Sequence, residues 1–231
     1  MDDDVRSVRY FIFTFFLENC RPPSLEDICA ACEVSEDRSL EILAALEKGR
    51  HLVLHKKDVH SPTPISMVHP FSHLPTSFIV THEDRSWWAN CAWCAFGLAS
   101  MLAPAAVQIH TRSGSIGKEM SFEVANDKVT LISEKSAEKP CVHFAVPLKS
   151  WWTDVRFACG TIQLFDSEEE ALAWPKKRGF NEGELMSLDT LWKLSKIWYH
   201  DKHTYEYCRK SSDEVIKLFE DLGLTSTFWR P

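Results

Sequence analysis

Apolar side chains near the start of the chain recur every three or four positions, which is the spacing of one helical face. This spacing predicts a first helix over 5–17, and the residues that share it are Val5, Val8, Phe11, Ile12, Phe15 and Phe16. Pro22 and Pro23 end the pattern. Ser24 is followed by Leu25 and two acidic residues and offers a hydroxyl cap, so a short second helix is predicted to run to about Cys32.

A third helix is predicted from Ser35, and Gly49 is placed to end it in a left-handed cap. Its inward positions are expected to be Leu40, Ile42, Leu43 and Leu46. Two short extended pieces follow at 51–55 and 65–68, joined by a polar turn at Lys57-Asp58. Three helices and a hairpin are typical of a winged helix. Residues 1–76 are therefore predicted to form a winged-helix-like N-terminal domain.

The remaining chain mixes short strands with helices, after a proline-bearing linker at 69–75 that is expected to be rigid. Strands are predicted at 78–80, 107–110, 120–124, 128–132, 141–147 and 161–165. Helices are predicted at 87–101, 168–174, 188–198 and 212–222, the last closed by Gly223. Residues 77–231 are thus expected to be a mixed α/β catalytic domain with an irregular sheet, and the fold class is α+β.

Charge narrows the possible partners. The chain has 26 Lys+Arg against 33 Asp+Glu, a formal net charge of −7, whereas binding to a phosphate backbone requires a basic surface. The would-be recognition helix at 36–47 is itself acidic, so no nucleic-acid partner is expected. The apolar stretch at 11–17 is too short to span a bilayer, and Asp2, Asp3 and Asp4 replace the basic flank of a signal peptide. No membrane partner and a cytoplasmic location are predicted.

Eight cysteines in a chain without a secretory signal are expected to be reduced thiols. Cys91 and Cys94 stand three apart at the start of a predicted buried helix, so their sulfurs share one face. A helix N-terminus lowers the pKa of a thiol, and the thiolate is both a nucleophile and a soft-metal ligand. Cys159 is expected at the edge of a strand, near Arg156. A C-x-x-C pair also occurs in redox proteins, zinc sites and packed cores, so spacing alone leaves these alternatives open.

Several stretches resemble the organomercurial lyases, also called alkylmercury lyases. They are RPPSLED at 21–27, HPFS at 69–72, WWANCAW at 87–93, VHFAVP at 142–147 and DVRFAC at 154–159, with 219–223 and 228–229 near the C-terminus. That family pairs a winged-helix-like domain with a mixed catalytic domain and cleaves a carbon–mercury bond with two cysteines and an aspartate. The resemblance matches Cys91 to the first cysteine and Cys159 to the second. Cys94 stands where the aspartate is expected.

The resemblance implies a detoxifying, mercury-resistance enzyme in which Cys91, Cys94 and Cys159 bind mercury as substrate and product. Two thiolates polarise the Hg–C bond, because mercury prefers sulfur. A thiol with a pKa of about 8.5 is mostly protonated at neutral pH and can supply the proton in place of the acid. A rival alignment register matches Cys94 to the first cysteine and puts Gly97 at the acid position. Small thiols or a mercuric reductase are the expected acceptors of Hg(II).

Two other functions remain open at this point: a non-catalytic soft-metal binder with a three-cysteine site, and an acidic winged-helix regulator that senses metal. No cofactor is expected, because 114–117 lacks the lysine of a phosphate loop. Trp87, Trp88, Trp93, Trp151 and Trp152 are interpreted as walls of the core and of an apolar pocket. His143 is interpreted as a core-edge or surface residue, and four other histidines, His69, His73, His200 and His203, lack the paired spacing of a metal site. Structural or incidental roles are assigned to Cys20, Cys29, Cys32, Cys141 and Cys208.

Overall fold

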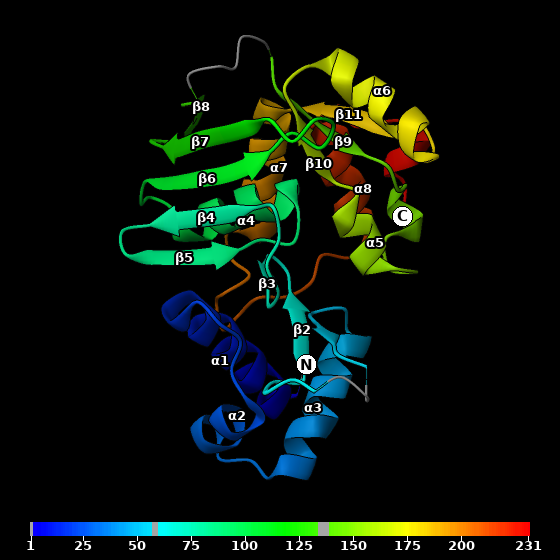
Figure 1. Cartoon of the computed structure of the whole chain (residues 1–231). Coiled ribbons are helices and arrows are strands. Elements are labelled where there is room, and N and C mark those ends of the chain that lie inside the picture. Colours follow the sequence, from blue (N-terminus) through cyan, green and yellow to red (C-terminus); the bar gives the residue numbers. More distant parts are fainter. Residues whose placement is uncertain (1, 57–59, 134–138) are drawn as a thin grey trace.

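The computed structural model describes residues 2–56, 60–133 and 139–231. Three N-terminal helices lie below two antiparallel sheets, and the remaining helices pack behind and beside those sheets (Figure 1). The mixed α+β class predicted from the sequence is confirmed. One apolar core runs through the molecule, from Val8 on the first helix to Trp229 near the C-terminus.

The N-terminal helices are α1 (Asp3–Asn19), α2 (Leu25–Cys32) and α3 (Glu36–Lys48). They are followed by a small sheet of β1 (Val53–Leu54), β2 (Ile65–Val68) and β3 (Phe71–Ser72), in the order β1-β2-β3. Ser24 begins α2 with a reciprocal capping box to Asp27, which satisfies two backbone donors at the helix start. The three predicted helices are therefore present, and the two predicted extended pieces pair as β1 and β2.

Helix α3 differs from the prediction in two ways, one at its end and one in its middle. Gly49 has a φ of −72°, and the left-handed residue is Arg50, at 61°. The glycine instead permits a close approach, because a Cβ at Gly49 would lie 3.0 Å from the His51 ring. Leu40 was expected to face inward but is 44% exposed. The predicted turn at Lys57-Asp58 lies outside the described residues.

The larger sheet has five antiparallel strands in the order β5-β4-β6-β7-β8. They are β4 (Ile79–His82), β5 (Arg85–Trp88), β6 (Val107–Arg112), β7 (Glu119–Ala125) and β8 (Lys128–Leu131). Burial alternates along β6, with Val107, Ile109 and Thr111 turned inward. Helices α4 (Ala92–Leu102) and α7 (Leu188–Tyr199) cover the inner face (Figure 1).

A second three-stranded sheet lies beside the five-stranded sheet and has the order β10-β9-β11. Its strands are β9 (Cys141–Phe144), β10 (Gln163–Phe165) and β11 (Glu184–Ser187). The surrounding helices are α5 (Val155–Gly160), α6 (Glu168–Arg178) and α8 (Ser212–Asp221), with short 3-10 turns at Leu148–Ser150 and Thr227–Trp229. Strand β11 was not predicted from the sequence.

One predicted element near the cysteines is wrong. The helix expected from Trp87 begins only at Ala92, because Trp87 and Trp88 belong to β5 and pair with Val80 and Ile79. Trp88 is 38% exposed and therefore does not line the core. The segment 69–75, expected to be a rigid linker, also contains β3, which was not predicted; β3 pairs with β2 and forms a bridge to Ala89.

Hydrogen bonds from side chains to backbone carbonyls join helix α1 to the rest of the chain. Arg9 on α1 is buried and donates hydrogen bonds to the carbonyls of Lys202, at 2.6 Å, and Thr204. The Trp87 indole donates to the carbonyl of Phe16 at 2.9 Å. Helix α1 therefore supports both β5 and the segment that follows α7. Within the described residues, no helix combines the length and the apolar character needed to cross a membrane.

Candidate functional site

Cys91 and Cys94 occupy the first turn of α4. Cys91 is the N-cap residue, in an extended conformation, and its sulfur accepts the backbone N–H of Cys94 at 3.4 Å. The preceding strand β5 ends at Trp88, and the Ala92 N–H bonds to the carbonyl of Ile162. These contacts fix the start of α4 against the segment that follows α5. Both sulfurs consequently face α5.

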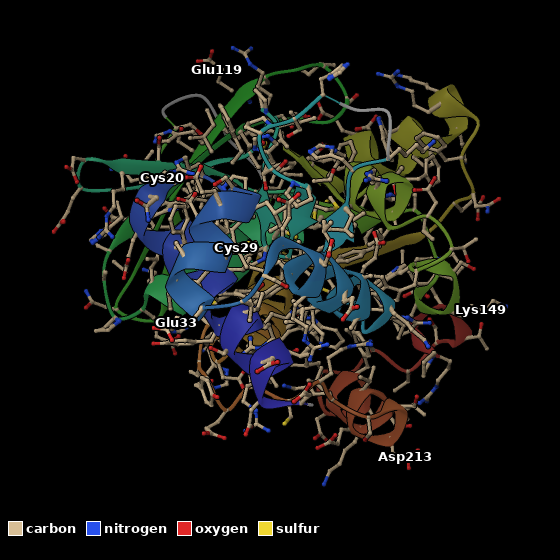
Figure 2. All side chains as sticks on the ribbon, turned by 90° about the horizontal axis from the view of Figure 1, so that it is seen from below. Cys20, Cys29, Glu33, Glu119, Lys149 and Asp213 are labelled. Carbon is tan, nitrogen blue, oxygen red and sulfur yellow. The ribbon has the colours of Figure 1, made fainter. Side chains whose placement is uncertain are left out.

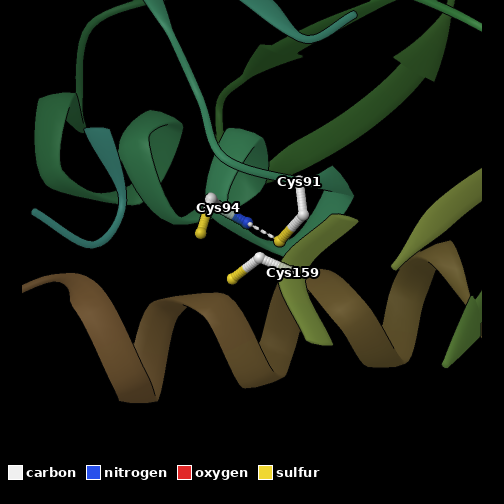
Figure 3. Close-up of side chains that lie close together, drawn as sticks. All are labelled: Cys91, Cys94 and Cys159. Carbon is white, nitrogen blue, oxygen red and sulfur yellow. Dashed lines mark hydrogen bonds between the residues drawn. The ribbon is translucent and has the colours of Figure 1, made fainter. Parts of the chain in front are cut away.

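Cys159 lies on α5 and not at the edge of a strand as predicted. Asp154 caps this short helix by accepting the Phe157 N–H at 3.0 Å. The three sulfurs of Cys91, Cys94 and Cys159 lie within 4.8 Å of one another, and all three residues are buried. Figure 3 shows the side chains pointing toward one another from α4 and α5, above α7. The structure thus brings together the three thiols singled out in the sequence.

Two further side chains contact the sulfurs and were not identified from the sequence. His69 Nε2 lies 3.3 Å from Cys159 Sγ, and the Tyr199 hydroxyl lies 3.4 Å from Cys94 Sγ. Sequence spacing gave His69 no role as a metal ligand, and its contact with Cys159 was not predicted. Its only available signal was the HPFS stretch at 69–72. Tyr199 ends α7 and carries no motif that could have singled it out.

The described residues place no carboxylate within the sulfur cluster, whose potential metal ligands are the three thiols alone. The rival alignment register would need an acid at position 97. A Cβ on Gly97 would lie 2.4 Å from the Tyr199 ring, closer than real Cβ contacts come. Helices α4 and α7 approach tightly at that glycine, so a carboxylate there does not fit.

The three thiols form one coupled titrating group. Burial raises the pKa of Cys94, but hydrogen bonds from Cys159, Cys91 and Tyr199 outweigh it and leave that pKa well below the usual thiol value. Burial and the neighbouring sulfurs raise the pKa of Cys91. Hydrogen bonding with Cys91 lowers the pKa of Cys159, but hydrogen bonding with Cys94 and burial outweigh it and raise that pKa. Cys94 is therefore expected to be the first of the three thiols to ionise. Burial lowers the pKa of His69 to about 4, so its ring is neutral.

As the pH rises, Cys94 is expected to lose its proton before Cys91 and Cys159 do. Because the Cys94 pKa is lowered, the thiolate persists above that pKa and is lost as the pH falls through it. Ultraviolet thiolate absorbance in an acid titration of the metal-free protein measures this step. Cys94→Ser should remove the step, and Cys141→Ser, at a buried cysteine outside the cluster, should retain it. A step that survives in Cys94→Ser would contradict the assignment.

A largely apolar cavity of about 60 Å³ opens beside Cys159. Trp93, Trp151 and Trp152 line it, as expected for three of the five tryptophans, and Trp198 adds a fourth indole. Trp87 is buried against Phe16 instead. Apolar walls of this kind accommodate a small organic group and reduce contact with water.

The remaining candidates lie outside the sulfur cluster. His143 was interpreted as a core-edge or surface residue but is fully buried, with Nε2 2.6 Å from the Glu182 carbonyl and the ring against Trp174. Cys20 directly follows α1 and Cys29 lies on α2 (Figure 2), where Cys29 Sγ is 3.3 Å from the Ser39 hydroxyl. These residues have local packing partners and do not reach the three sulfurs.

Comparisons with known proteins agree with this geometry. The sequence model of the alkylmercury lyase family matches residues 71–200, more than half of the chain and a range that includes all three clustered cysteines. A solved structure, the crystal structure of the mercury-bound form of MerB2, is similar with a TM-score of 0.67 and 20% sequence identity. The similarity covers 88% of this chain and 93% of that chain. No curated protein matches the sequence. The match over 71–200 shows that this chain belongs to the alkylmercury lyase family.

Proposed function

We propose that this protein cleaves the carbon–mercury bond of organomercurials by protonolysis, with Cys91 and Cys159 as mercury ligands and Cys94 as the proton carrier. The observation that carries the proposal is the buried group of three sulfurs within 4.8 Å beside an apolar cavity. Convergent thiolates bind mercury strongly, because both are soft. The indole walls shelter the organic group while the sulfurs hold the metal.

The resting site supplies two protons, on Cys91 and Cys159, and one thiolate, on Cys94. Cys159 passes its proton to the Cys94 thiolate and attacks mercury, displacing the small thiolate that delivered the substrate. Cys91 then gives its proton to the departing thiolate and becomes the second ligand. These steps leave a neutral Cys94 thiol beside a mercury atom that carries the organic group and two protein sulfurs.

Cleavage transfers the Cys94 proton to carbon. The electron pair of the C–Hg bond forms the new C–H bond, the hydrocarbon departs, and Hg(II) stays on the Cys91 and Cys159 thiolates. Cys94 is again a thiolate and binds Hg(II) as a third ligand. The Tyr199 hydroxyl, 3.4 Å from Cys94 Sγ, stabilises that charge by donating a hydrogen bond. Small thiols, or a mercuric reductase, then accept Hg(II).

The N-terminal residues 1–76 are, in this proposal, a winged-helix-like covering module for the catalytic residues 77–231. Support comes from His69, whose ring contacts Cys159, and from Phe13, which lines the cavity. Both side chains precede residue 77 in the sequence. The module's role is then to close and support the site, and the excess of acidic residues in it does not suit a DNA-binding surface.

Hydrocarbon release in a single turnover tests the proposed activity. Equimolar phenylmercury is added to the reduced protein, and benzene is measured in the headspace by gas chromatography. The wild type is expected to release about one benzene per active site. Cys94→Ser lacks the proton carrier, so it is expected to bind phenylmercury but to form benzene far more slowly. No release by the wild type, together with release by Cys94→Asp, would overturn the proposal and leave a three-thiolate mercury binder.

A further inference from the structure

Four basic side chains line the cavity that leads to Cys159; two of them are exposed and two are half-buried. They come from two distant parts of the sequence, the end of α3 and the segment between α7 and α8, and they are Arg50, Lys202, Arg209 and Lys210. The cavity interior is lined by indoles and the thiol. The exposed Arg50 and Arg209 thus place positive charge at the solvent side of an apolar cavity, and Lys202 and Lys210 add charge further in; together the four form its basic rim. An amphiphilic ligand with an anionic end matches this arrangement.

The cations are held close together. The guanidinium carbons of Arg50 and Arg209 lie 5.6 and 5.7 Å from the centre of the Trp152 ring, and Lys202 Nζ lies 4.6 Å from the Tyr199 ring. Burial and then the charge of Arg50 lower the pKa of Arg209. Like charges gathered around two aromatic rings repel one another. A bound anion would relieve this repulsion.

Carboxylates are missing from this rim. Among the residues that the structure describes, no aspartate or glutamate lines the cavity, and none of the four basic side chains forms an ion pair. The chain as a whole has a net charge of −7. The net negative surface repels an anionic ligand, so a local group of cations directs that ligand to the mouth of this cavity. Because the four cations line the cavity that leads to Cys159, the ligand would arrive where the substrate enters.

We propose that this rim, which we call the cationic entrance (Arg50, Lys202, Arg209 and Lys210), binds the carboxylates of a small thiol that delivers the organomercurial. The inference rests on the proposed function. In a mercury–thiol adduct the organic group and the thiol lie on opposite sides of mercury. With the organic group against the indoles and mercury at Cys159, the thiol remains at the entrance. Carboxylates on that thiol reach the guanidinium groups, which bind them by charge-assisted hydrogen bonds.

The rate at which the protein captures phenylmercury tests this inference independently of carbon–mercury cleavage. Stopped-flow quenching of tryptophan fluorescence follows capture from three adducts, with glutathione, which carries carboxylates, with neutral mercaptoethanol, and with cationic cysteamine. We expect the ratio of the glutathione rate to the mercaptoethanol rate to fall about tenfold in Arg50→Gln/Arg209→Gln and at high salt, since steering by charge is screened. Cysteamine should show the opposite change.

Arg178→Gln is the matched control, because Arg178 is an exposed arginine at the end of α6, outside the cavity. Its rate ratio should equal that of the wild type. An equal ratio in the double variant and the control would overturn the inference. A further measurement uses p-mercuribenzoate delivered by mercaptoethanol, in which the carboxylate is on the organic group. If the capture rate of that adduct alone changes in the double variant, the recognised carboxylate belongs to the organic group, and the assignment to the thiol is wrong. Capture remains measurable even if no hydrocarbon forms, so failure of the proposed function is a separate result.

Discussion

Replacing Cys159 by serine is expected to lower organomercurial turnover by about a thousandfold or more, the scale of loss seen when one member of a group that acts as a unit is removed. A serine hydroxyl is a hard donor and stays protonated, so it neither holds mercury nor gives its proton to Cys94. Hydrocarbon release with excess small thiol measures the loss. The same result is expected for Cys91→Ser.

Cys91→Ser separates chemistry from folding. Cys91 is the N-cap of α4, and serine is among the preferred N-cap residues, so the helix start should be retained. Thermal unfolding should therefore change little while turnover is lost. Cys141→Ser is the control, because Cys141 is buried on β9 outside the sulfur cluster. Turnover that persists in Cys91→Ser at a substantial fraction of the wild-type rate would contradict its role as a ligand.

Local patterns predicted the helices because their signals lie within a few residues. Apolar spacing located α1, and the serines that begin α2 and α8 form capping boxes in the structure. The error at Trp87-Trp88 has a physical cause. A short apolar run fits a strand or a buried helix equally well, and pairing with β4 decided the outcome. That pairing is a tertiary effect and has no local signal.

The site could be predicted only in part for a similar reason. Cys91 and Cys94 are neighbours on one helical turn, so their spacing was informative, but Cys159 was connected to them by family resemblance alone. His69 and Tyr199 reach the sulfurs from positions 90 and 105 residues away from their partners. Contacts over such separations depend on how β3, α5 and α7 pack. A single sequence contains no direct measure of that packing.

Arg9→Met is expected to destabilise the protein by about 3 kcal/mol, because it leaves buried carbonyl groups without their donors. Arg9 is 1% exposed and binds the carbonyls of Lys202 and Thr204, with a longer contact of 3.4 Å to that of Tyr205. Methionine fills a similar volume but donates no hydrogen bond. Urea unfolding measures the change, and proteolysis within 200–211 reports whether that segment has loosened.

Arg38→Met is the matched control for burial. Arg38 also has several partners, with ion pairs to Asp2, Asp4 and Glu41, but these are exposed at the surface, where such pairs contribute little. Equal losses in the two variants would contradict the argument for Arg9. Because Arg9 anchors the backbone of Lys202, its loss should also raise the KM for a glutathione adduct more than that for a mercaptoethanol adduct. A helix from the first residues of the chain would then control an entrance built by residues near its end.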